Sequence, residues 1–194
     1  MSKILFFDTE TTGLPRNYKA PVEDINNWPS IVQLAYIMTN EYGDVILKNM
    51  SIVNPGDVQI SKNASETHGI SEELAKQGVN NYYAIGDFYT MAKSSDLLVA
   101  HNYNFDSKVL MSEAHKLNRH DYKLLIEQPS ICTMLASTKY CAIPGNYGKF
   151  KWPKLQELYF NLFGEEFEGA HDALYDVEAM VKCYFKLKEL EIIL

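Results

Sequence analysis

The sequence lacks long apolar runs, a secretion signal and cysteines in metal-binding spacing. No stretch approaches the roughly 18 apolar residues that a membrane span needs, and the N-terminus enters a strand-like segment directly at Lys3. Cys132, Cys141 and Cys183 are odd in number and show no CxxC spacing, so free thiols in a reducing compartment are expected. These absences predict a cytoplasmic protein with no membrane partner.

An excess of positive charge is also missing. The net charge of −7 argues against binding of duplex nucleic acid through a broad basic face. One segment differs, because no Asp or Glu occurs from Gln128 to Gln156. Cations suit phosphates and aromatic rings suit unstacked bases, so this segment fits single-stranded nucleic acid. A surface loop whose aromatic residues tuck into the core fits equally well. Its lysines and aromatic residues are Lys139, Tyr140, Tyr147, Lys149, Phe150, Lys151, Trp152 and Lys154.

The length of 194 residues suits a single domain that covers positions 1–194. Ile4 to Phe7 is apolar on both faces, which predicts a central strand. Antiparallel strands come first and are followed by strands that alternate with helices, so the pattern predicts a mixed α/β sheet with helices on both faces. The expected strands are 31–38, 45–53 and 97–100, and the expected helices are 82–94, 104–117, one after Pro129, one after Pro153 and 172–190.

Asp8-Thr9-Glu10 closes the first expected strand. Side chains two positions apart on a strand point the same way, so Asp8 and Glu10 are expected to project together from its end. Like charges repel each other and burial adds a desolvation cost, both of which a divalent cation offsets. A solvated strand end whose acids face water explains the pair as well.

Three further polar residues stand out near the starts of helices. Asp106 begins the apolar stripe of the helix from Asn104, where it is either an N-terminal cap or a functional acid. His171 and Asp176 are five residues apart, about 140° on a helix. The sequence therefore predicts that His171 lies on the entry loop, which brings its imidazole back over the carboxylate of Asp176.

Together these residues make four carboxylates and one imidazole that a mixed sheet can bring to one point. This set suits two-metal hydrolysis of phosphodiesters, with hard cations such as Mg²⁺ or Mn²⁺ bound by carboxylate oxygens. An imidazole titrates near neutral pH and can take the proton of the attacking water.

Three ordered motifs resemble the DEDDh class of DnaQ-like 3′–5′ exonucleases. They are Phe-Phe-Asp8-Thr-Glu10-Thr-Thr-Gly-Leu14, His101-Asn102-Tyr-Asn-Phe105-Asp106 and His171-Asp172-Ala173-Leu-Tyr-Asp176, with a softer match at His68-Gly69-Ile70. The resemblance runs from residue 4 to about 180. It implies a ribonuclease H-like α/β fold with a five-stranded mixed sheet flanked by helices on both faces.

The resemblance also implies roles for individual residues. Asp8, Glu10, Asp106 and Asp176 would hold two divalent metal ions, and His171 would be the general base. Thr11, Thr12, Leu14 and Phe105 would contact the terminal nucleotide, with core packing as the alternative for Phe105. Lys149 and Lys151 belong to the basic segment and are candidate substrate contacts. His68 and His101 are interpreted as structural, and Arg16, Lys19 and Trp28 lie in a segment that could border the substrate.

The expected activity is release of nucleoside monophosphates from 3′ ends of single-stranded DNA or RNA, as in proofreading. The alternatives are an exonuclease of short oligoribonucleotides and a catalytically silent nucleic-acid-binding domain. A phosphatase with Asp8 as nucleophile would leave His171 and Asp176 unexplained. A DNA polymerase acting in trans is a candidate partner, and the sequence does not choose between these substrates or fix the oligomeric state.

Overall fold

The computed structural model describes residues 2–193 and contains one mixed β-sheet. Its strands are β1 (Lys3–Thr11), β2 (Ile31–Asn40), β3 (Val45–Asn54), β4 (Val79–Asn80), β5 (Leu97–Ala100) and β6 (Ser130–Cys132). The spatial order is β4-β3-β2-β1-β5-β6. Since β1 pairs antiparallel with β2 and parallel with β5, its carboxyl end reaches the same edge as the carboxyl end of β5.

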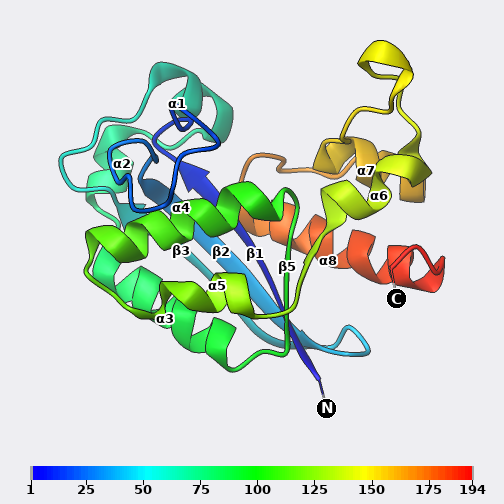
Figure 1. Ribbon diagram of the computed structural model, residues 1–194, viewed down its shortest axis with the longest axis horizontal. Helices are drawn as coiled ribbons and strands as arrows, with labels where there is room; N and C mark the ends of the chain where they lie inside the picture. The colour runs from blue at the N-terminus through cyan, green and yellow to red at the C-terminus, as the bar shows by residue number, and fades with distance from the viewer. Residues whose placement is uncertain (1, 194) are drawn as a thin grey trace.

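Helices cover both faces of the sheet (Figure 1). On one side lie α3 (Asn81–Lys93), α4 (Tyr103–Lys116) and α5 (Leu124–Glu127), which follows the 3₁₀ turn η1 (Asp121–Lys123). On the other side lie α6 (Thr133–Cys141), α7 (Leu155–Phe163) and α8 (Ala173–Glu189), with the 3₁₀ turn η2 (Asn146–Gly148) between α6 and α7. Two short helices, α1 (Lys62–His68) and α2 (Glu72–Lys76), precede β4.

The alternation of side chains along β1 divides the core into two parts. Leu5 and Phe7 pack with the α3 and α4 residues on one face. Ile4 and Phe6 pack with α7 and α8 on the other. Because both faces are covered, every residue of β2 is buried. Positions 8 and 10 continue the face of Ile4 and Phe6, which therefore directs their side chains towards α8.

The mixed sheet between helices is confirmed, but the predicted number of strands was wrong. The sheet has six strands where five were expected, and β6 lies between Pro129 and α6, the helix that was expected after Pro129. Strand β4 has two residues and β6 has three, which is too short for a two-residue hydrophobic period to be recognised. Their pairing with β3 and β5 defines them as strands.

Within residues 2–193, no helix combines the length and the apolar character that crossing a bilayer would require. All three cysteines are free, as expected, and Cys141 and Cys183 are buried.

Candidate active site

Asp8 and Glu10 stand near the carboxyl end of β1, on the face that α8 covers. Both side chains are half-buried. They face the start of α8, where Asp176 occupies the first turn and is buried. This geometry brings three carboxylates from two elements to one point.

Asp106 reaches the same point from α4. Its side chain is 3% exposed, and its Oδ1 accepts hydrogen bonds from the backbone N–H of Thr9 at 3.2 Å and from the Thr9 hydroxyl at 2.7 Å. Thr9 lies between Asp8 and Glu10 on β1. Asp106 is therefore fastened to the strand that carries the first two acids, and it does not act as a side-chain cap of its own helix.

His171 lies on the loop before α8, beside Asp176. Its backbone has a φ of 71°, and its N–H donates to Asp176 Oδ2 at 3.1 Å. Asp172 begins the helix, because its Oδ1 accepts from the N–H of Leu174 at 2.9 Å. One side-chain atom each from Glu10, His171 and Asp176 lies within 4.8 Å of the others. The entry loop thus brings the imidazole into the group of acids.

Burial and mutual repulsion make these carboxylates hard to ionise. Desolvation, followed by the charges of the neighbouring acids, raises the pKa of Asp8 well above its usual range. The same causes raise the pKa of Glu10 to about 8. Desolvation raises the pKa of Asp106 to about 7, although the hydrogen bonds from Thr9 act to lower it. Desolvation also raises the pKa of Asp176 to about 6. Positive charge at this position would restore the ionised forms.

The donor set fits a divalent cation. Asp176 Oδ1 is buried and has no hydrogen-bond partner, which is costly for a carboxylate unless an ion binds there. Carboxylate oxygens are the preferred ligands of hard cations such as Mg²⁺ and Mn²⁺. The acidic cluster with His171 can therefore hold metal.

The acids open into a cleft of about 610 Å³. A second cavity of about 410 Å³ adjoins it, and four residues line both spaces: Thr9, Glu10, Leu14 and Phe105. Leu14 is 73% exposed, so its side chain is available to a ligand. The cleft is lined by Asp8, Thr9, Glu10, Leu14, Tyr18, His101, Asn102, Phe105, Asp106, Met134, Trp152, Pro153, Lys154, Leu155, Gln156, His171 and Asp176.

Thr11 and Thr12 are both buried and hydrogen-bonded within the protein. The Thr11 hydroxyl donates to the carbonyl of Gly13 at 2.7 Å. Thr12 Oγ1 accepts from the N–H of Ser30 at 3.0 Å, and the N–H of Thr12 donates to the Ser30 carbonyl at 2.8 Å. Thr11 lines the second cavity. These side chains shape the turn that presents Leu14, and the Thr12 hydroxyl is absent from the walls of both cavities.

Two histidines near the cleft make structural hydrogen bonds. His68 Nε2 lies 3.2 Å from the Thr11 carbonyl and its Nδ1 accepts from the N–H of Ile70. His101 joins the end of β5 to Thr133 Oγ1 at 2.9 Å and to the Pro153 carbonyl at 3.0 Å. Desolvation lowers the pKa of His101 to about 4, so it is neutral near pH 7.

The basic segment lies partly in the cleft and partly outside it. Trp152 and Lys154 line the cleft, whereas Lys149 is exposed beyond it and Lys151 pairs with Glu157 at 2.5 Å. Residues 142–152, which we call the arm, extend away from the body between α6 and α7 (Figure 1). A bridge between Pro144 and Phe150 closes the arm. Its aromatic residues are exposed, which excludes the expectation that they tuck into the core.

Comparison with known protein families identifies the family to which the chain belongs. Residues 5–184 match the model of a family described as exonuclease. The chain belongs to this exonuclease family. The match confirms the resemblance to DnaQ-like 3′–5′ exonucleases that the three motifs indicated.

Two curated proteins are similar to almost the whole chain. The PolC-type DNA polymerase III of Bacillus subtilis is 28% identical over 189 residues, which are 95% of this chain and 11% of that protein. The PolC-type polymerase of Caldanaerobacter subterraneus is 28% identical over 197 residues, covering 98% of this chain and 12% of the protein. The exonuclease chain thus spans a small part of the length of these curated relatives.

Solved structures confirm the fold. Escherichia coli exonuclease I in complex with a dA16 oligonucleotide superposes with a TM-score of 0.77 at 19% identity, over 97% of this chain and 41% of that chain. Exonuclease I from Methylocaldum szegediense gives a TM-score of 0.77 at 18% identity, again over 97% and 41%. The E. coli protein has also been solved in a zinc-bound complex with single-stranded DNA.

Several cleft residues of this exonuclease domain were not identified from the sequence. Tyr18, Met134 and Gln156 line the cleft but belong to no motif. Tyr18 lies in the segment that was expected to border the substrate, where Trp28 proves to be buried and donates its indole N–H to the Pro21 carbonyl. Tertiary packing brings Tyr18, Met134 and Gln156 to the cleft, and neither their spacing in the sequence nor their residue type indicates this.

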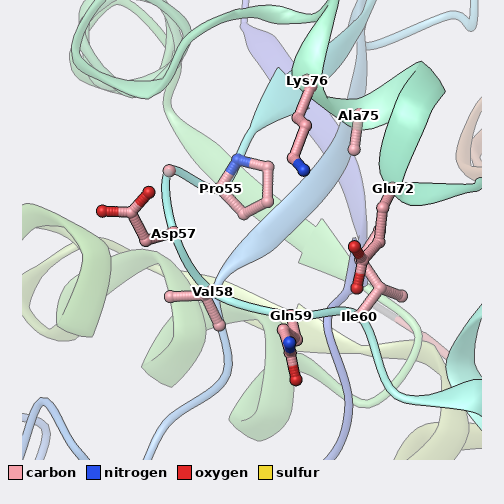
Figure 2. Close-up of a pocket in the computed structure, with 9 residues that line it drawn as sticks. Pro55, Asp57, Val58, Gln59, Ile60, Glu72, Ala75 and Lys76 are labelled. Carbon is pink, nitrogen blue, oxygen red and sulfur yellow. The ribbon is translucent and has the colours of Figure 1, made fainter.

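A further pocket of about 160 Å³ lies apart from the acids, at the end of β3 (Figure 2). It is enclosed by the loop from Pro55 to Ile60 and by Glu72, Ala75 and Lys76 of α2. None of the five candidate catalytic residues lines it, so it is separate from the acidic cleft.

Proposed function

We propose that the chain is a metal-dependent 3′–5′ exonuclease that releases nucleoside monophosphates from single-stranded nucleic acid. The observation that carries this proposal is the cluster of four carboxylates with raised pKa values at the base of a cleft, one of them with an unpartnered buried oxygen. Family membership supports the direction of digestion. Residues 1–194 would form one exonuclease domain, and a place in the cytoplasm would suit its three free cysteines.

Asp8, Glu10, Asp106 and Asp176 would hold two divalent cations, Mg²⁺ or Mn²⁺. When bound, such ions supply Lewis acidity towards the scissile phosphate and balance the charge of the acids. His171 takes the proton of the attacking water. The water oxygen forms a bond to the last phosphorus, the bond from that phosphorus to the 3′ oxygen breaks, and the leaving 3′ oxygen takes a proton from solvent. The products are a nucleoside 5′-monophosphate and a strand one nucleotide shorter.

The walls of the cleft suit a single strand. Leu14 and Phe105 offer apolar surface to the terminal base, and hydrogen bonds of the Thr11 and Thr12 side chains shape the turn that presents Leu14. Lys149 and Lys151 would attract the phosphates of the upstream strand from the arm. Exonuclease I, which shares the fold, has been solved with dA16 and dT13, so single-stranded DNA is the substrate we favour. The PolC-type relatives make a DNA polymerase acting in trans a partner worth testing.

A time course on 5′-labelled single strands of DNA and RNA tests the proposal. With Mg²⁺ or Mn²⁺, the band should shorten one nucleotide at a time, and EDTA should stop it. Asp8→Asn and Asp106→Asn, which keep the side-chain size, should abolish the ladder while circular dichroism stays unchanged. Folded wild-type protein that binds the strand without shortening it would favour a silent binding domain instead.

A further inference from the structure

Gln33 is a buried polar residue near the start of the largely apolar strand β2. It lies on β2 and is 2% exposed, and it stands opposite Glu10 in the register of β1 and β2. A buried amide is costly unless its oxygen and its nitrogen both find partners. Its partners therefore indicate why a glutamine occupies this position.

Both ends of the Gln33 amide bind the start of α8. Oε1 accepts a hydrogen bond from the backbone N–H of Ala173 at 3.0 Å. Nε2 donates to Asp172 Oδ2 at 3.3 Å. Asp172 also caps α8 through its Oδ1. The first turn of the helix is thus attached to the central sheet by one side chain, next to the strand that bears Glu10.

We propose that Gln33 is a positioning residue that sets the distance between Glu10 and the pair formed by His171 and Asp176. This inference rests on the proposed function. The residues that Gln33 holds, Asp172 and Ala173, lie between His171 and Asp176 in the chain. Loss of either hydrogen bond frees the helix start to shift against β1, and the metal-binding atoms on the two elements then separate.

The Gln33 amide accepts at one end and donates at the other, and substitutions can exchange these two roles. Gln33→Glu keeps an acceptor for the Ala173 N–H but places a carboxylate against Asp172, where a donor is needed. In the double variant Gln33→Glu/Asp172→Asn, the new amide at 172 can donate to the new carboxylate at 33. Asn is as good an N-cap as Asp, so the cap of α8 is retained. The exchange reverses donor and acceptor while it preserves the hydrogen bond.

The experiment measures Mn²⁺ affinity by calorimetry, together with kcat and KM on a single strand. Gln33→Glu should weaken Mn²⁺ binding and lower kcat by about 10–100-fold, the range for residues that orient metal ligands, with KM little changed. The double variant should recover most of this loss. Gln59→Glu is the matched control, because Gln59 is exposed in the loop of Figure 2 and the substitution adds the same charge.

Each outcome bears on a different claim. Active wild-type protein with unchanged Mn²⁺ affinity in Gln33→Glu overturns the role of Gln33 alone, and so does a double variant no better than the additive effect of its two substitutions. Wild-type protein that neither binds Mn²⁺ nor shortens the strand overturns the proposed function as well. If Gln33→Glu does not fold, Gln33→Met removes both hydrogen bonds without adding charge and should show the same loss of affinity.

Discussion

At the scale of single residues, His171 combines two roles in one position. Its backbone N–H binds Asp176, while its imidazole lies among the acids at the base of the cleft. Its φ of 71° is unfavourable for a residue with a Cβ, and such strain commonly occurs at functional sites. The backbone therefore holds the ring where it can act either as a base or as a metal ligand.

Replacement of His171 by Ala distinguishes these two roles. If the imidazole is the general base, the rate should fall by about 10²–10⁴ while Mn²⁺ binding, measured by calorimetry, remains close to wild type. An equal loss of Mn²⁺ affinity and rate would instead assign the ring to the metal. His120→Ala is the matched control, because His120 is exposed and lies in the turn before η1.

The role of a residue could be predicted where neighbours in the sequence determine it, and not where a contact across the fold determines it. The pairing of Asp8 with Glu10 follows from alternation along one strand, and the position of His171 follows from the offset to Asp176. Gln33 acts across the sheet, through a register that only the folded chain defines. A polar residue within an apolar strand was the available signal, but its partners could not be read from spacing.

At the scale of elements, the conformation of the loop before α8 depends on Gly169. Its φ is +79°, and a Cβ there would lie 2.6 Å from the ring of Tyr175. The loop therefore needs glycine both for its backbone conformation and for the close approach of the ring. Gly164 has a similar φ of +73°, but a Cβ there would meet no atom within 4 Å.

This pair of glycines gives a controlled test of the loop. Both Gly164→Ala and Gly169→Ala incur a backbone cost of about 1–2 kcal/mol, whereas only Gly169→Ala adds a steric clash, typically about 1–3 kcal/mol. Gly169→Ala should therefore lower the thermal midpoint more and reduce kcat, while Gly164→Ala keeps its kcat. Equal kcat values in the two variants would show that the Tyr175 contact does not position His171.

The lysines of the arm, with the neighbouring Lys154, predict how binding depends on salt. Neutralising Lys149, Lys151 and Lys154 together as Gln should raise KM for a long strand and flatten the salt dependence, by about 0.7 in log–log slope for each phosphate that a lysine no longer neutralises. A short oligonucleotide that cannot reach Lys149 and Lys151 should be affected less, because only Lys154 lines the cleft. The control replaces three exposed lysines on other helices, Lys62, Lys93 and Lys188, one of which is ion-paired as Lys151 is. If the log–log salt slopes of the two triple variants are identical, Lys149, Lys151 and Lys154 do not contact the substrate.

The sequence predicts long elements better than short ones. Strand β1 is an apolar run closed by two acids and helix α8 is a long helix, and the structure has both close to the expected bounds. Strands β4 and β6 exist only through their pairing with β3 and β5. Whether the arm extends or folds back could not be decided from composition, because both arrangements suit lysines and aromatic residues.

At the scale of the whole molecule, the acidic cluster predicts that stability depends on pH and on divalent metal. Without metal, the pKa of Glu10 is about 8 and that of Asp106 about 7 in the folded state, both above the values of the unfolded chain. The folded state therefore binds more protons than the unfolded state, so the free energy of unfolding falls as pH rises towards 8. His101, with its pKa lowered to about 4, has the opposite effect, but only below its ordinary value of 6.5.

The range from pH 6.5 to 8.5 therefore isolates the carboxylates. In metal-free buffer the thermal midpoint should fall across this range by several degrees, since each kcal/mol corresponds to about 2–4 °C in a chain of this size. Mn²⁺ should raise the midpoint most at pH 8.5, where it replaces the lost protons. Asp8→Asn, which removes one of the repelling charges, should raise the metal-free midpoint and reduce the effect of Mn²⁺. A metal-free midpoint that rises with pH would mean that the acids are solvated and that the cluster is not a metal site.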